Sequence, residues 1–152
     1  MRTFYPLISA LVANILAQIL KPLFHYLRTG EQKFGLLAES GGFPSSHTSM
    51  VVGLTTAVGL QEGINSTLFF ISIIFSLITI YDAANVRYYA GQNIAMTKQL
   101  IKDIETLTQH KFSDPIYLMK IKTVLGHKWV EVFGGIVLGT LIPSLLFLFI
   151  KD

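Results

Sequence analysis

The sequence predicts an all-α integral membrane protein, a bundle of about four transmembrane helices with an amphipathic helix in the third loop. Its composition indicates a membrane protein. Of the 152 residues, 51% are hydrophobic and only 14% are charged, whereas about 25% of the residues in soluble domains are charged. The mean hydropathy is +0.55. The chain has no cysteine, which excludes disulfides and thiolate metal sites. Its length suits a single membrane domain, residues 1–152.

Four apolar stretches account for the expected transmembrane helices: residues 4–27, 48–60, 68–80 and 130–150. A transmembrane helix needs about 20 residues, and the first, third and fourth stretches reach that length with their flanks. The second reaches it only with Ser46–His47 and Gln61–Glu62 included, so a re-entrant or interfacial segment is the alternative. We interpret the first stretch as an uncleaved helix, because no clear small-residue cleavage site follows it.

The longest polar stretch, residues 85–128, is expected to contain the amphipathic helix. Its apolar residues recur at helical spacing: Ile94, Leu100, Ile101, Ile104 and Leu107. Such a helix would lie on the membrane surface or over the bundle. A solvated helical linker is the simpler alternative, because runs of charge usually mark a solvated face.

The basic residues predict the orientation in the cell membrane. Nine of the twelve fall in the loops after the first and third apolar stretches: Arg28, Lys33, Arg87, Lys98, Lys102, Lys111, Lys120, Lys122 and Lys128. The positive-inside rule therefore puts both loops in the cytoplasm and both termini outside. Because the net charge of +3 lies between apolar segments rather than on a polar domain, we expect no nucleic-acid partner.

Polar side chains lie at the expected cytoplasmic ends of all four helices. They are Lys21, Ser45, Ser46, His47, Asp82, Arg87, His127 and Glu131. Ionisable groups at membrane depth are costly and tend to mark a functional site. No cluster of carboxylates suits magnesium, and the nearby cations disfavour zinc, so we expect neither a metal nor another cofactor.

The segment "FPSSHTS" is the first candidate element of a site. Pro44 interrupts the preceding chain, and Ser45 or Ser46 can cap the helix that follows. The free N–H groups of a helix N-terminus favour a bound anion, and His47 lies beside them as a candidate general acid. A cap with no further role is the alternative for this segment alone.

The segment "GHKWVE" is the second candidate element. His127 and Glu131 are four residues apart and share one face of a helix. The carboxylate can fix the imidazole tautomer and leave the other nitrogen as a nucleophile or base. Gly126 would let another group approach closely. An interfacial pair at a helix start is the alternative for this segment alone.

Together these residues indicate phosphoryl transfer. His127 would attack phosphorus, Glu131 would stabilise the resulting imidazolium, and His47 would protonate the leaving oxygen. Lys21, Ser45, Ser46 and Arg87 would hold the phosphate, with the N–H groups after Pro44. Asp82 would orient Arg87 or simply pair with it.

Four motifs carry a resemblance to a known family: "GGFPSSHTS", "AVGLQEG", "YDAANVRYYAGQ" and "LGHKWVEVFGG". They resemble the divergent branch of the type 2 phosphatidic acid phosphatase superfamily, which also includes the vanadium haloperoxidases. The resemblance implies a helical fold and metal-independent phosphomonoesterase or pyrophosphatase chemistry through a phosphohistidine. It makes His47 the acid of the second motif and His127 the nucleophile of the third. Glu131 stands where an aspartate is usual.

Two positions depart from the superfamily pattern. Ile121 occupies the position of the third-motif arginine, and Lys21 lacks the later arginine-proline partner of the first motif. Arg87 would take the place of a missing arginine from another helix end.

The expected partner is a phosphorylated lipid within the membrane. The resemblance points to phosphatidylglycerophosphate, and phosphatidic acid and polyprenyl pyrophosphate remain open.

Two other classes of function remain open at this point. One is a degenerate family member that binds lipid phosphate without turnover. The other is a channel or transporter subunit in which Lys21, Asp82, Arg87 and Glu131 line a polar path. Gly135 and Gly139 have the spacing of an association motif, which more often means packing within one bundle, so the oligomeric state is open.

Overall fold

The computed structural model describes residues 2–38, 41–118 and 126–150, and this part of the chain is helical without strands. Its elements, in order, are η1 (Arg2–Phe4), α1 (Tyr5–Thr29), η2 (Phe34–Ala38), α2 (Ser46–Glu62), α3 (Thr67–Tyr81), η3 (Asp82–Val86), α4 (Arg87–Thr108), α5 (Pro115–Leu118) and α6 (Trp129–Ile150). The predicted all-α membrane bundle is confirmed. The segment η3 is a π-helix.

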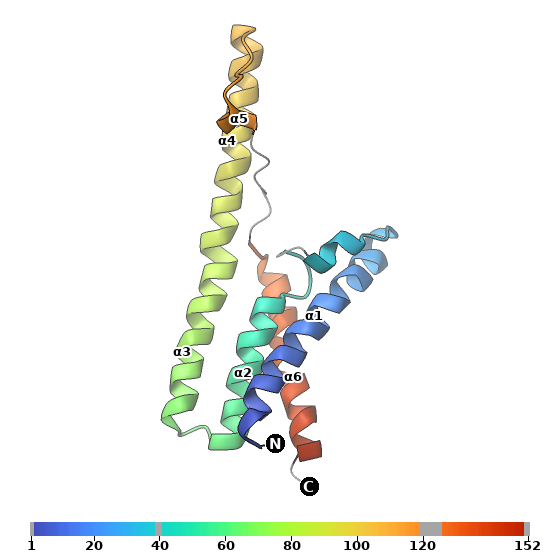
Figure 1. The fold of residues 1–152 in the computed structure, drawn as a ribbon, viewed down its shortest axis with the longest axis vertical. Coiled ribbons are helices and arrows are strands. Elements are labelled where there is room, and N and C mark those ends of the chain that lie inside the picture. The colour runs from blue at the N-terminus through green and yellow to red at the C-terminus, as the bar shows by residue number, and fades with distance from the viewer. Residues whose placement is uncertain (1, 39–40, 119–125, 151–152) are drawn as a thin grey trace.

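Helices α1, α2, α3 and α6 form the bundle, with α2 in contact with each of the other three. The two termini lie at the same end of it (Figure 1). Within the described residues, three helical segments are long and apolar enough to cross a membrane: Tyr5–Thr29, Thr67–Thr108 and Trp129–Phe149. Helix α2 has only 17 residues, yet it runs between the other helices along the bundle (Figure 1). This position is that of a short fourth bundle helix rather than of a segment lying across the bundle end.

Small residues let the helices around α2 approach closely. Ala13 of α1 is completely buried, and a Cβ on Gly53 of α2 would lie 3.2 Å from its Cβ. On α6, a Cβ on Gly135 would lie 2.7 Å from the Ser45 carbonyl oxygen, and one on Gly139 would lie 2.8 Å from that of Ser49. The glycine pair of α6 therefore packs against α2 within the chain.

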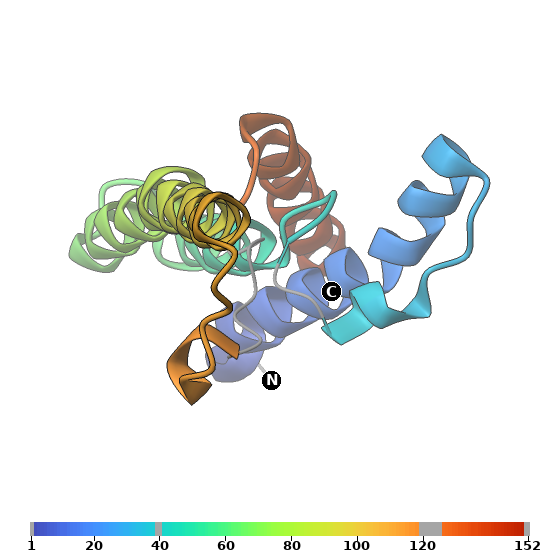
Figure 2. The ribbon, with the colours of Figure 1, turned by 90° about the horizontal axis from the view of Figure 1, so that it is seen from above.

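The amphipathic helix expected in the third loop is present as α4. It continues from α3 through η3 as one long rod that projects beyond the bundle (Figure 1), and the rod is seen almost end-on in Figure 2. The expectation that it lies over the bundle is therefore wrong. The reason is local: residues 81–87 contain neither glycine nor proline, so the π-turn shifts the helix without ending it. The position of Ile121 lies outside the described residues, as do Lys120 and Lys122.

Candidate active site

The candidate site lies at the end of the bundle away from the termini. Four segments meet there: the C-terminal half of α1, the loop before α2, the π-helix η3 and the start of α6. Backbone hydrogen bonds join three of them, because the N–H of Ser45 donates to the carbonyl of Glu131 and the N–H of His127 donates to that of Ala83, both at 2.9 Å. The fourth segment joins through Lys21, whose Nζ lies 3.4 Å from Ser46 Oγ.

The His127 side chain is held by Glu131. Its Nδ1 lies 2.8 Å from Glu131 Oε2, and only 2% of the residue is exposed. An ionised carboxylate only accepts hydrogen bonds, so Nδ1 carries a proton, and in the neutral imidazole Nε2 then has the lone pair. Nε2 is buried and has no hydrogen-bond partner among the described residues. This is the arrangement expected of an imidazole nucleophile or base.

The backbone at His127 is held by the π-helix η3. The Ala83 carbonyl of η3 accepts the His127 N–H. A Cβ on Gly126 would lie 2.3 Å from the backbone nitrogen of Tyr88, so only glycine fits this approach. The close approach expected at Gly126 is confirmed, and the approaching group is the backbone at the start of α4. The π-turn itself has no signal in the sequence that we could identify, although such turns are frequent at functional sites.

The loop before α2 caps that helix as the sequence predicted, and the capping residue is Ser45. Its Oγ accepts a hydrogen bond from the Thr48 N–H at 3.3 Å. Ser45, Ser46 and Thr48 are all buried at the site. Thr48 was not singled out in the sequence, yet its buried Oγ1 has no partner among the described residues. Thr48 belongs to the same "FPSSHTS" segment as Ser45 and Ser46, and this was the only feature of the sequence that could have marked it as a site residue.

His47 is exposed and lies beside the buried histidine. The ring centroids of His47 and His127 are 6.3 Å apart, with 60° between the ring planes. The charges of Arg87, Lys21 and Asp82 act electrostatically on His47. The structure thus brings the two predicted catalytic histidines together, His47 from the first turn of α2 and His127 from the segment before α6.

Arg87 and Asp82 form an ion pair across η3, between Nε and Oδ2. Both side chains are substantially exposed, at 54% and 38%. The pairing that the sequence left open is therefore present. The Arg87 guanidinium faces solvent near His47 rather than lying in the buried core of the site.

Lys21 is the buried cation of the site, with 1% of the residue exposed. Its aliphatic stem lies along Gly42, where a Cβ would meet Lys21 Cδ at 3.7 Å. Asn14, two helical turns earlier on α1, donates to the Ser46 carbonyl at 3.2 Å. It thereby links α1 to the start of α2, and it was not singled out in the sequence.

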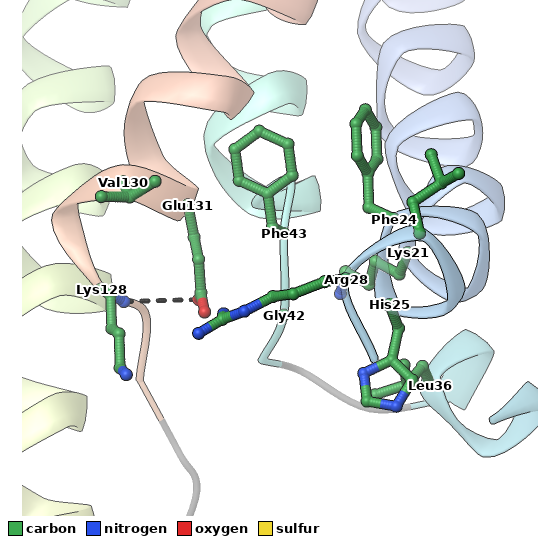
Figure 3. Close-up of a pocket in the computed structure, with 11 residues that line it drawn as sticks. Lys21, Phe24, His25, Arg28, Leu36, Gly42, Phe43, Lys128, Val130 and Glu131 are labelled. Atoms are coloured by element: carbon green, nitrogen blue, oxygen red, sulfur yellow. Dashed lines mark hydrogen bonds between the residues drawn. The ribbon is translucent and has the colours of Figure 1, made fainter. Parts of the chain in front are cut away.

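A cavity of about 690 Å³ lies between α1 and the start of α6, beside Glu131. Lys21 and Glu131 lie in its wall, together with Arg28 of α1 and Lys128 before α6 (Figure 3). Within the described residues, no group of three or more histidine, aspartate or glutamate side chains could hold a metal ion. The site offers an anion a set of cations, hydroxyls and N–H groups instead.

A sequence model of the divergent PAP2 family matches residues 3–142. The chain belongs to the divergent PAP2 family. It is also 35% identical over 149 residues to the "Uncharacterized membrane protein YuiD" of Bacillus subtilis (strain 168), covering 95% of this chain and 94% of that protein. No solved structure matches the chain. Family membership indicates a phosphatase-related fold, and the membrane relative and the three long apolar helices together indicate a multi-pass membrane protein.

Proposed function

We propose that this protein is a metal-independent lipid phosphate phosphatase that forms a phosphohistidine on His127. The observation that supports it most strongly is the buried Nε2 of His127, which has no partner among the described residues while Nδ1 is fixed by Glu131. A fixed tautomer gives Nε2 a lone pair ready to attack an electrophile. Family membership supports phosphorus as that electrophile.

The reaction has two steps. In the first, His127 Nε2 bonds to phosphorus, the bond between phosphorus and the lipid oxygen breaks, and His47 gives its proton to that oxygen. In the second, His47 takes a proton from water, which attacks the phosphohistidine and releases inorganic phosphate and the free imidazole. Glu131 stabilises the imidazolium that forms in between.

Phosphate binding is assigned to groups that surround the two histidines. Lys21 supplies a buried charge next to Ser46, and Ser45 and Ser46 belong to the N-terminus of α2, where the helix favours an anion. Arg87, oriented by Asp82, closes the set from the solvent side. Nε2 is covered in this structure, so substrate entry requires a small rearrangement of the side chains around it.

The substrate that we propose first is phosphatidylglycerophosphate, ahead of phosphatidic acid and polyprenyl pyrophosphate. The site lies at the bundle end away from both termini (Figure 1), and the positive-inside rule places that end in the cytoplasm. A phosphorylated lipid made in the cytoplasmic leaflet reaches such a site directly.

The test is release of phosphate by purified protein in detergent with a chelator present. Phosphatidylglycerophosphate should be hydrolysed, His127→Ala should abolish release, and His110→Ala should leave it unchanged, because His110 lies after α4, outside the site. Full activity in His127→Ala would disprove the assignment of the nucleophile.

One observation favours a second candidate, a protein that binds lipid phosphate without turnover. The third-motif arginine position holds Ile121, and Arg87 is already paired with Asp82. Binding of the lipid by the wild-type protein, with no phosphate released from any lipid phosphate, would support this candidate over the phosphatase.

A further inference from the structure

The cavity beside Glu131 contains more positive charge than the histidine site requires. Arg28 and Lys128 line it in addition to Lys21 (Figure 3). Among the described residues, neither Arg28 nor Lys128 takes part in a salt bridge, and Glu131 is the one acidic residue in the lining. Glu131 is already engaged by His127 and by the N–H of Lys128. The cavity therefore presents a net positive charge to whatever enters it.

The cavity shares two wall residues with the proposed reaction centre. Lys21 and Glu131 belong to both, because Lys21 contacts Ser46 and Glu131 contacts His127. A molecule whose terminal phosphate lies at His127 would thus reach the Arg28 and Lys128 side with its next chemical group. A volume of about 690 Å³ falls in the usual range of ligand sites, roughly 300–1,000 Å³.

Apart from His25, the remaining walls of the cavity carry no polar side chain. Phe24 and Phe43 pack edge to face, with ring centroids 4.9 Å apart. Leu27 and Val130 are 70% and 71% exposed, so the cavity opens towards apolar surface on α1 and α6. A charged headgroup with hydrocarbon attached matches both kinds of wall, whereas a free inorganic ion would leave the apolar wall unused.

We infer that this cavity binds a second phosphate group of the same lipid, so that the substrate class is a lipid with an anionic phosphodiester next to its terminal phosphate. Arg28 and Lys128 contact the diester, and the terminal monoester lies between His127 and His47. The inference rests on the proposed function and narrows it. A lipid whose only phosphate is the terminal monoester, such as phosphatidic acid, leaves the two cations without a ligand.

The kinetic test compares phosphatidylglycerophosphate with phosphatidic acid, matched in acyl chains, in the same neutral detergent micelles. Arg28→Gln and Lys128→Gln should each raise KM for phosphatidylglycerophosphate about tenfold, the size expected for one charge-assisted hydrogen bond. They should leave kcat for phosphatidylglycerophosphate unchanged. For phosphatidic acid, kcat/KM should stay within about twofold of the wild-type value. Lys102→Gln, which removes a cation from α4, is the matched control. It should change neither KM nor kcat for either lipid. Equal losses on both lipids would overturn the inference.

A binding test separates this inference from the proposed function. Trp129 is the chain's one tryptophan, is 62% exposed, and lies between two residues that line the cavity. Brominated phosphatidylglycerol, which has the diester and no monoester, should quench its fluorescence more strongly than brominated diacylglycerol. Arg28→Gln should remove that difference.

Each result of the binding test has one meaning. Quenching that depends on Arg28 in a protein without turnover would support the cavity and contradict the phosphatase. Turnover with quenching that is unaffected by Arg28→Gln would support the phosphatase and contradict the phosphodiester site in the cavity. Displacement of the brominated lipid by millimolar inorganic phosphate alone would show that the cavity binds free phosphate, and would also overturn the inference.

Discussion

His127 Nδ1 lies 2.8 Å from Glu131 Oε2. His127 precedes α6, which begins at Trp129, and Glu131 lies in its first turn. The buried imidazole therefore has one nitrogen fixed by a carboxylate and one without a partner among the described residues. This relationship leaves Nε2 as the nitrogen for the proposed attack on phosphorus, and it leads directly to the first prediction.

Glu131→Gln should lower kcat about 10²–10⁴-fold with little change in KM, the range expected when the carboxylate that orients a catalytic histidine is lost. The amide removes the negative charge that stabilises the imidazolium, and its NH₂ group favours the tautomer with the proton on Nε2. Steady-state phosphate release from phosphatidylglycerophosphate measures the effect. The matched control is Glu62→Gln, because Glu62 ends α2 at the opposite end of the bundle; a similar loss there would point to a general effect on the protein.

His47→Asn should slow the release of phosphate from a phosphorylated lipid, whose leaving group is an alcohol, about 10²–10⁴-fold. This is the usual contribution of a general acid. The loss in the rate of the first step should be much smaller with an aryl phosphate such as p-nitrophenyl phosphate, because this leaving group departs without a proton. The comparison uses the initial burst of leaving group, which reports the first step alone, because the second step needs His47 as a base with either substrate. Equal losses on both would contradict the assignment of His47 as the acid, and His110→Asn should affect neither.

Gly126→Ala should destabilise the protein by about 1–3 kcal/mol, the usual cost of an overpacked site. The new Cβ would meet the backbone of Tyr88 and Arg87 at 2.3–2.8 Å, and a backbone cannot rotate away as a side chain does. The melting temperature in detergent measures the change. Gly35→Ala is the control, since nothing lies within 4 Å of a Cβ there, and an equal drop in both variants would contradict the account of the η3 contact.

A cysteine at position 113 should react with a thiol reagent only from the cytoplasmic side, and one at position 65 only from outside. Ser113 lies in the exposed segment after α4 and Asn65 in the turn between α2 and α3, which Figure 1 places at opposite ends of the molecule. The chain has no native cysteine, so each label reports one position. A membrane-impermeant reagent that labels Ser113→Cys in intact cells would reverse the proposed orientation.

The sequence was sufficient for much of the fold and for the meeting of the site residues. Hydropathy and the cap of α2 are local properties, so the positions of the apolar helices and the start of α2 follow from their own residues. The pairing of His127 with Glu131 was expected from helical spacing, and it is present although His127 precedes α6 and only Glu131 lies in the helix. The capping role at Ser45 follows from residue type.

What the sequence could not supply depends on contacts between distant segments. The π-turn at η3 is adopted where Ala83 receives the His127 N–H, a bond between residues 44 positions apart. The direction of α4 depends on that same turn. That Arg28 and Lys128 line one cavity between α1 and the start of α6 could likewise be seen only in the structure.

The most direct test of the central claim is to look for the phosphorylated enzyme. Wild-type protein mixed with ³²P-labelled phosphatidylglycerophosphate and quenched within milliseconds in alkali should carry label that is stable in base and labile in acid. Peptide mapping should place that label on His127, and His127→Ala should carry none. Phosphate released at the normal rate by His127→Ala, or label mapped to another residue, would contradict the phosphohistidine mechanism.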